Sequence, residues 1–172
     1  METPELAYIP YEDFVDDVKA LGLAIGTDGW TPDFVVGIGR GGLVPGAYLS
    51  HRIGIALLSV DHSSRVHDFA DELLAKLAAQ TAAGTRILFV DDINDSGSTI
   101  LYLRAAIERG GAPANARVGV LIDNIRSAAR VDYRSREIDR DTDKRWFVFP
   151  WEAMSDEATL AAAAEEVPER LA

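Results

Sequence analysis

The chain has 172 residues, no cysteine, an apolar share of 48% and a net charge of −11 at pH 7. This length allows one domain with a substantial core, and the lack of cysteine excludes disulfides and thiolate metal sites. The acidic charge argues against a nucleic-acid or anionic-membrane partner, because such partners bind basic surfaces. No apolar run approaches the ~20 residues of a membrane span and the first residues do not resemble a signal peptide, so we expect a soluble cytoplasmic protein.

Apolar residues recur at helical spacing in some segments and form short continuous runs in others. In chain order, the pattern predicts a helix over 11–25, a strand over 34–36, a helix over 43–53, a strand over 55–60, a helix over 69–79, a strand over 87–90, a helix over 99–108, a strand over 118–122, an alternating edge strand over 131–138, a strand over 145–149 and a helix over 157–166. Strands that alternate with helices indicate an α/β domain with a central, mostly parallel sheet flanked by helices. Ligands bind at the carboxyl ends of the strands in such sheets.

The first loop at a strand end is Gly37–Gly42, which fits the pattern G-x-G-x-x-G between a strand and a helix. With Asp61 at the end of the next strand, this pattern is typical of dinucleotide-binding proteins. Arg40 places a bulky cation inside the loop, however, and Pro45 interrupts the helix that follows. The dinucleotide interpretation also gives no role to the second loop, and a tight turn without any ligand is a further alternative.

The second loop, Asp95–Thr99, contains small residues between a strand and a helix. Such residues let backbone N–H groups converge on one anion, and the helix N-terminus adds partial positive charge. We therefore predict a phosphate monoester site, which is not a P-loop because Gly-Lys-Ser/Thr is absent. Asp91 and Asp92 lie just upstream, where two carboxylates can hold vicinal ribose hydroxyls or contact a Mg²⁺ ion bound to substrate oxygens. Alternatively, one aspartate caps the turn and the other is solvated.

Three segments together resemble the type I phosphoribosyltransferases. Ile87–Thr99 (ILFVDDINDSGST) resembles the loop that binds phosphoribosyl diphosphate (PRPP). Gly37–Gly54 (GIGRGGLVPGAYLSHRIG) resembles the pyrophosphate-binding loop and helix of bacterial xanthine-guanine phosphoribosyltransferases, and Arg145–Glu152 (RWFVFPWE) resembles the base-binding strand of the same 6-oxopurine branch. The three matches occur in the family's order and span Phe34 to Glu152.

The resemblance implies one phosphoribosyltransferase domain over 1–172. Its core would cover about 30–125, and a small hood would come from the N-terminal segment and about 140–172. The implied 5′-phosphate site consists of Asp95, Ser96, Gly97, Ser98 and Thr99. In addition, Asp91 and Asp92 would hold the ribose, with Asp92 also contacting Mg²⁺, and Arg40 and Gly41 would hold the pyrophosphate.

Three further expectations come from the resemblance. Asp95 would be the catalytic residue, exchanging a proton with N7 of a purine. The peptide bond between Gly39 and Arg40 would be cis, as it often is in this family. His62–Val66 would form the tip of a mobile loop that shields the reaction from water.

The resemblance places the base against Trp146 or Phe147. Core packing is the alternative for both, and it suits Phe147, which alternates with Phe149, better than Trp146, which follows Lys144 and Arg145. The 6-oxopurine enzymes usually have a lysine after the fourth strand of the sheet, which donates to the purine O6. Here the segment reads LIDNIRS, with Ile125 at the expected position. The adjacent Arg126 would substitute for the lysine, unless it is solvated. Glu152 would accept a hydrogen bond from the base or contact a metal, unless it is a solvated loop residue.

We therefore expect a purine phosphoribosyltransferase that makes a nucleoside 5′-monophosphate and pyrophosphate from PRPP and xanthine, guanine or hypoxanthine. The resemblance implies Mg²⁺ as cofactor and a homodimer or homotetramer. Two alternatives remain open at this point. One is a non-catalytic PRPP-binding regulatory protein, and the other is a dinucleotide-binding oxidoreductase.

Overall fold

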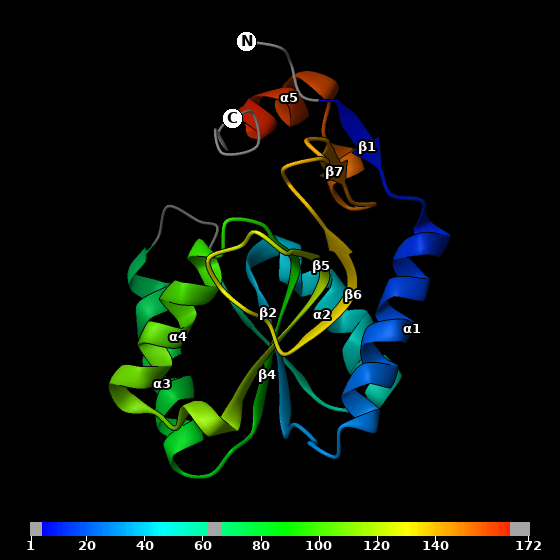
Figure 1. Cartoon of the computed structure of the whole chain (residues 1–172). Helices are drawn as coiled ribbons and strands as arrows, with labels where there is room; N and C mark the ends of the chain where they lie inside the picture. The colour runs from blue at the N-terminus through cyan, green and yellow to red at the C-terminus, as the bar shows by residue number, and fades with distance from the viewer. Residues whose placement is uncertain (1–4, 62–66, 166–172) are drawn as a thin grey trace.

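The computed structural model describes residues 5–61 and 67–165 and contains a five-stranded parallel sheet covered by helices on both faces (Figure 1). The strand order is β3-β2-β4-β5-β6, and every neighbouring pair is parallel. The strands are β2 (Phe34–Ile38), β3 (Leu57–Val60), β4 (Ile87–Asn94), β5 (Ala116–Asn124) and β6 (Tyr133–Ile138). The α/β fold with a mostly parallel sheet, predicted from the alternation of strands and helices, is confirmed.

Each face of the sheet packs against one pair of helices. Helices α1 (Tyr11–Thr27) and α2 (Gly39–Ile53) cover one face, and α3 (His67–Ala82) and α4 (Ser98–Gly110) cover the other. Because successive side chains of a strand point to opposite faces, consecutive residues of β2, and likewise of β4, pack into different hydrophobic cores. Val35 and Leu88 pack with α1 and α2, while Val36 and Phe89 pack with α3 and α4. In the described ranges, no helix is long and apolar enough to cross a bilayer.

A second, smaller layer lies above the carboxyl ends of the sheet strands, and we call it the hood (Figure 1). It consists of β1 (Leu6–Tyr8), β7 (Trp146–Val148), the 3₁₀ turn η2 (Glu152–Met154) and α5 (Glu157–Glu165). Strands β1 and β7 form a parallel two-stranded sheet, with Leu6 opposite Trp146 and Tyr8 opposite Val148. The hood therefore joins segments from the two ends of the described chain.

Three differences from the predictions concern the site and the hood. Strand β4 continues through Asn94, so Asp91 and Asp92 lie within the strand and not beyond its end. Helix α2 begins at Gly39, four residues before the predicted start at residue 43, because its glycine-rich first turn lies against β4. Strand β1 was not predicted, since three residues are too few to show a period.

The first turn of α2 lies unusually close to β4. A Cβ atom on Gly42 would stand 2.1 Å from the carbonyl oxygen of Val90, and a Cβ atom on Gly41 would stand 2.6 Å from a carboxylate oxygen of Asp92. Two glycines at these positions therefore let the helix backbone reach the strand that carries the paired aspartates.

The Gly42→Ala substitution tests this close approach. We expect it to lower the free energy of unfolding by about 3 kcal/mol, because the backbone atoms that it would meet cannot move aside. The measurement is urea denaturation followed by circular dichroism. The matched control is Gly110→Ala at the exposed end of α4, where a Cβ would meet nothing within 4 Å; it should change stability by no more than about 1 kcal/mol. Equal effects at both positions would contradict the packing argument.

Candidate active site

A cavity of about 640 Å³ lies between the carboxyl end of the sheet and the hood. Its lining comes from the first turn of α2, from β4, from the first turn of α4, and from the hood. Seven residues given a site role from sequence line it together: Arg40, Gly41, Asp91, Asp92, Thr99, Trp146 and Glu152. Residues separated by more than a hundred positions in the sequence thus face one space.

Asp91 and Asp92 are half-buried side by side on β4. The backbone N–H of Asp92 donates to Asp91 Oδ1 at 3.1 Å, and the N–H of Ile93 donates to Asp92 Oδ1 at 2.7 Å. Burial, and next the charge of Asp92, raise the pKa of Asp91 well above the ordinary aspartate value. The strand therefore holds two carboxylates whose negative charges oppose each other, which suits a ligand that brings positive charge or hydroxyl donors.

The segment Asp95–Thr99 forms the N-terminal end of α4. Gly97 has φ +89° and caps the helix, and the hydroxyl oxygens of Ser96 and Ser98 lie 3.0 Å apart. A side chain at Gly97 would meet the backbone nitrogen of Ala129 at 2.6 Å, so the loop after β5 supports this turn from behind. Thr99 lines the cavity, whereas Asp95, Ser96, Gly97 and Ser98 are not among the lining residues.

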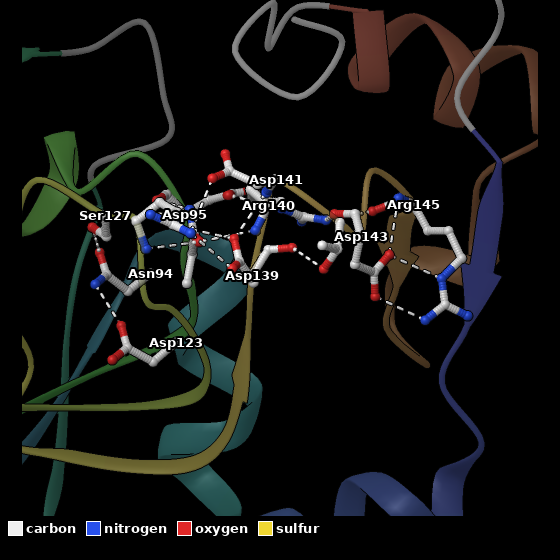
Figure 2. Close-up of polar contacts among 12 residues, drawn as sticks. Asn94, Asp95, Asp123, Ser127, Asp139, Arg140, Asp141, Asp143 and Arg145 are labelled. Atoms are coloured by element: carbon white, nitrogen blue, oxygen red, sulfur yellow. Dashed lines mark hydrogen bonds and ion pairs between the residues drawn. The ribbon is translucent and has the colours of Figure 1, made fainter.

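Buried polar side chains fix the end of β4 against the loop after β5 (Figure 2). The amide of Asn94 donates to Asp123 Oδ1 at 2.7 Å and to the carbonyl of Ala129 at 2.9 Å. The hydroxyl of Ser127 donates to Asn94 Oδ1 at 2.9 Å, and the amide of Asn124 donates to the carbonyl of Asp95 at 3.0 Å. The turn that precedes α4 is thereby anchored to β5.

The first turn of α2 brings Arg40 and Gly41 to the cavity, with Gly41 directly against Asp92. The prediction of a cis bond between Gly39 and Arg40 is wrong for this structure, which has no cis peptide bond in the part of the chain that it describes. Gly39 instead has φ +56°, a left-handed value that glycine adopts without steric cost. The turn into the helix is made by that glycine conformation.

Asp95 forms a buried, bidentate salt bridge with Arg140, which the sequence did not predict (Figure 2). Arg140 Nε donates to Asp95 Oδ1 at 2.9 Å and Nη2 donates to Oδ2 at 3.0 Å. Arg140 is only 5% exposed, and its Nη1 donates to the carbonyls of Asp143 and Arg145 at 3.0 and 2.7 Å. One guanidinium therefore links the start of α4 to the segment that leads into β7.

Trp146 and Phe147 have different surroundings, although both were base-binding candidates. Trp146 lines the cavity, whereas Phe147 packs with the core under α1 and α2 and lies below the guanidinium of Arg140, 5.1 Å from its ring centroid. Trp151, which the sequence analysis did not single out, also lines the cavity and stacks on Phe149 with ring centroids 4.8 Å apart. Glu152 lines the cavity too, and its Oε2 accepts a hydrogen bond from the Phe149 N–H at 3.0 Å.

Arg126 lies outside the cavity lining, contrary to its expected contact with the base. It makes a bidentate ion pair with Asp139 at 3.0 and 3.1 Å and a second pair with Asp141 at 3.1 Å. These two carboxylates hold it on the exposed side of the loop after β5. Ile125, at the expected lysine position, is exposed and equally absent from the lining.

The paired carboxylates of the cavity are suited to a Mg²⁺ ion that is bound at the same time by oxygens of the substrate. Among the described residues, no group of three or more histidine, aspartate or glutamate side chains forms a cage for a metal ion. Magnesium is usually held by one or two carboxylates together with water and substrate phosphates. The adjacent carboxylates of Asp91 and Asp92 meet that requirement, and a cation there would offset their mutual repulsion. The predicted loop tip His62–Val66 falls outside the described residues.

Comparisons with known proteins bear on the family and the fold. A family model of the phosphoribosyl transferase domain matches residues 11–158. A purine phosphoribosyltransferase from Pyrococcus horikoshii Ot3 has a similar structure, with a TM-score of 0.64 and 23% identity over 86% of this chain and 94% of that one. A Helicobacter pylori xanthine-guanine-hypoxanthine phosphoribosyltransferase has a TM-score of 0.63 and 18% identity over 87% of this chain and 95% of that one. A hypothetical protein from Neisseria gonorrhoeae with bound ppGpp has a TM-score of 0.67 and 20% identity over 96% of this chain and 99% of that one.

The chain belongs to the phosphoribosyltransferase family, because the family model covers most of its length. It is a phosphoribosyltransferase enzyme with the type I fold, as the resemblance of its three motifs implied. The match also includes the glycine-rich turn Gly37–Gly42, so this turn does not require the dinucleotide interpretation.

The raised pKa of Asp91 predicts a pH-dependent effect on stability. An acid whose pKa is higher in the folded state than its value of about 3.9 in the unfolded state costs stability as the pH rises through that interval. Asp91→Asn removes this cost, and its amide oxygen can still accept from the Asp92 N–H. The variant should therefore unfold at a higher temperature than the wild type at pH 7 in EDTA, and the difference should disappear near pH 4.

The matched control is Asp16→Asn on the exposed face of α1, where Asp16 pairs with Lys19. It should change the unfolding temperature little, because exposed ion pairs contribute little to stability. A variant Asp91→Asn that is no more stable than the wild type at pH 7 would show that the two carboxylates do not strain the folded state.

Proposed function

We propose that this protein is a purine phosphoribosyltransferase that transfers the phosphoribosyl group of PRPP to a 6-oxopurine, giving a nucleoside 5′-monophosphate and pyrophosphate. The observation that carries the proposal is the cavity that Arg40, the paired aspartates, Thr99 and Trp146 share. These residues provide, in one space, groups suited to a diphosphate, a ribose, a phosphate and an aromatic ring.

The reaction forms a bond between a base nitrogen and C1 of the ribose while the bond from C1 to pyrophosphate breaks. Backbone N–H groups and hydroxyls at the start of α4 would bind the 5′-phosphate. Asp91 and Asp92 would hold the two ribose hydroxyls and stabilise positive charge that develops on the ring. Arg40 and the N–H of Gly41 would bind the departing pyrophosphate, and Asp95 would accept the proton from N7.

Asp91 and Asp92 are the residues that would hold Mg²⁺, which supplies charge neutralisation at the pyrophosphate when it is bound. Trp146 would stack on the base from the hood. The hood would also exclude water from the cavity, because a ribose carrying positive charge reacts readily with water. A homodimer or homotetramer remains our expectation for the assembly, and light scattering after gel filtration measures it.

The test is nucleotide formation from PRPP and Mg²⁺ with xanthine, guanine, hypoxanthine, adenine, uracil and orotate in parallel. We expect turnover of at least one 6-oxopurine, and we expect Asp95→Asn to reduce kcat by about 10²-fold or more, since it removes the proton acceptor. Binding of PRPP without turnover of any base would instead support the alternative, a non-catalytic PRPP-binding regulatory protein. Turnover of adenine, uracil or orotate alone would contradict the choice of a 6-oxopurine.

A second prediction separates the two aromatic candidates on β7. Trp146→Ala should raise KM for the base by about tenfold or more, because stacking on an aromatic ring contributes roughly 1–3 kcal/mol per base, and it should leave KM for PRPP nearly unchanged. Phe147→Ala should act mainly on stability, lowering the free energy of unfolding by about 2 kcal/mol or more. A larger effect of Phe147→Ala than of Trp146→Ala on KM for the base would reverse the assignment.

A further inference from the structure

The proposed function leaves open which residue distinguishes an oxygen from an amino group at C6 of the purine. The cation expected from sequence is engaged elsewhere, because Ile125 occupies the lysine position and Arg126 is held by Asp139 and Asp141. Arg145 is half exposed and makes its own bidentate pair with Asp143 at 2.8 and 3.0 Å. Arg140, unlike Arg126 and Arg145, is buried.

Arg140 is the buried cation nearest to the catalytic machinery, because it is paired directly with Asp95. The purine N7 and the substituent at C6 lie on the same edge of the ring system, next to each other. Neither Asp95 nor Arg140 is among the residues that line the cavity. If Asp95 faces N7, as the proposed function has it, a side chain held against its carboxylate lies beside the place of the 6-substituent. Figure 2 shows Arg140 between Asp95 and the segment that carries Asp143 and Arg145.

The hydrogen bonds of Arg140 leave one donor available. An arginine side chain has five N–H groups. The single N–H of Nε and one N–H of Nη2 are donated to Asp95, and both N–H groups of Nη1 are donated to the carbonyls of Asp143 and Arg145. Within the described part of the chain, the second N–H of Nη2 has no acceptor. This donor belongs to the nitrogen that already contacts Asp95.

The position of Arg140 also ties this donor to the stacking residue. Its Nη1 binds the carbonyl of Arg145, the residue immediately before Trp146, at 2.7 Å. Its guanidinium lies 5.1 Å from the ring centroid of Phe147, the residue immediately after Trp146. The cation is therefore held between the carboxylate expected at N7 and the strand expected to stack on the base.

We propose that Arg140 is the specificity-determining residue of this enzyme, donating from Nη2 to an oxygen at C6 of the purine while Asp95 accepts from N7–H. This inference rests on the proposed function. The pair presents an acceptor and a donor side by side, which matches N7–H and O6 of hypoxanthine or guanine. Adenine carries an amino group at C6 and would set one donor against another, leaving the buried N–H without an acceptor.

The experiment compares wild type, Arg140→Lys and Arg140→Met in two measurements. The first is kcat/KM for hypoxanthine and for adenine with PRPP and Mg²⁺. The second is the Kd for IMP and for AMP by calorimetry, which needs no turnover. We expect Arg140→Met to reduce the preference for hypoxanthine over adenine, and for IMP over AMP, by about tenfold or more. Arg140→Lys should restore part of this preference, because it keeps a cationic donor.

The matched control is Arg117→Met, which removes an arginine paired with Asp28 near the start of β5, at the opposite end of the sheet. It should leave both preferences unchanged. Circular dichroism and thermal unfolding establish that each variant is folded, and Arg140→Lys carries the test if Arg140→Met does not fold.

The two possible failures are distinguishable. If the wild type turns over hypoxanthine while the Arg140 variants lose activity toward both bases equally and bind IMP and AMP with unchanged preference, Arg140 only positions Asp95, and this inference is overturned. If the wild type turns over no base at all, the proposed function is overturned, and this inference with it.

Discussion

Two carboxylates held side by side at the end of a buried strand are the constraint around which this site is organised. Asp91 and Asp92 follow four fully buried residues of β4, and the first turn of α2 packs directly against them through Gly41 and Gly42. Placing adjacent negative charges in a partly buried position is unfavourable. The two hydrophobic cores on either side of the sheet supply the stability that offsets this cost. The repulsion between the two carboxylates thus lies where the hydroxyl groups of a substrate, and a cation bound with it, would reduce it.

The salt bridge between Asp95 and Arg140 has a different role, because it connects the two layers of the molecule. A buried ion pair contributes little net stability once the cost of removing both charges from water is counted. It does, however, demand one geometry, since both partners become costly if they separate. Here that demand fixes the start of α4 relative to the segment that precedes β7. The part of the site suited to phosphate and the part suited to a base are consequently held in one arrangement.

The sequence predicted most of the architecture because the large elements carry clear periodicity. Strand β4 begins with a continuous run of buried apolar residues, and helix α4 buries apolar residues at helical spacing. The motif that joins them indicated the fold and three residues of the cavity, Asp91, Asp92 and Thr99. At the glycine-rich turn, the local sequence pattern predicted a loop where the structure has the first turn of α2. There, Gly41 and Gly42 read as loop residues, although their lack of a side chain serves a helix packed against β4.

The choice of a base-reading cation shows why other parts could not be predicted. Arg126 was selected because it is adjacent to Ile125 in the sequence, yet two nearby aspartates hold it away from the cavity. Arg140 pairs with a residue 45 positions earlier, and the segment around it alternates arginine and aspartate without a distinguishing pattern. Only the three-dimensional arrangement shows which of these arginines is buried against Asp95.

The pairing of β1 with β7 also has a consequence for the order in which the protein folds. Leu6 lies opposite Trp146, so this small sheet forms only after almost the whole described chain has been made. Contacts between such distant segments carry a large entropic cost until the intervening chain is compact. During synthesis, most of the parallel sheet can therefore assemble before β7 has been made and can pair with β1. We expect the hood to be the last part to become ordered and the first to open, so that loss of the base site precedes loss of the sheet.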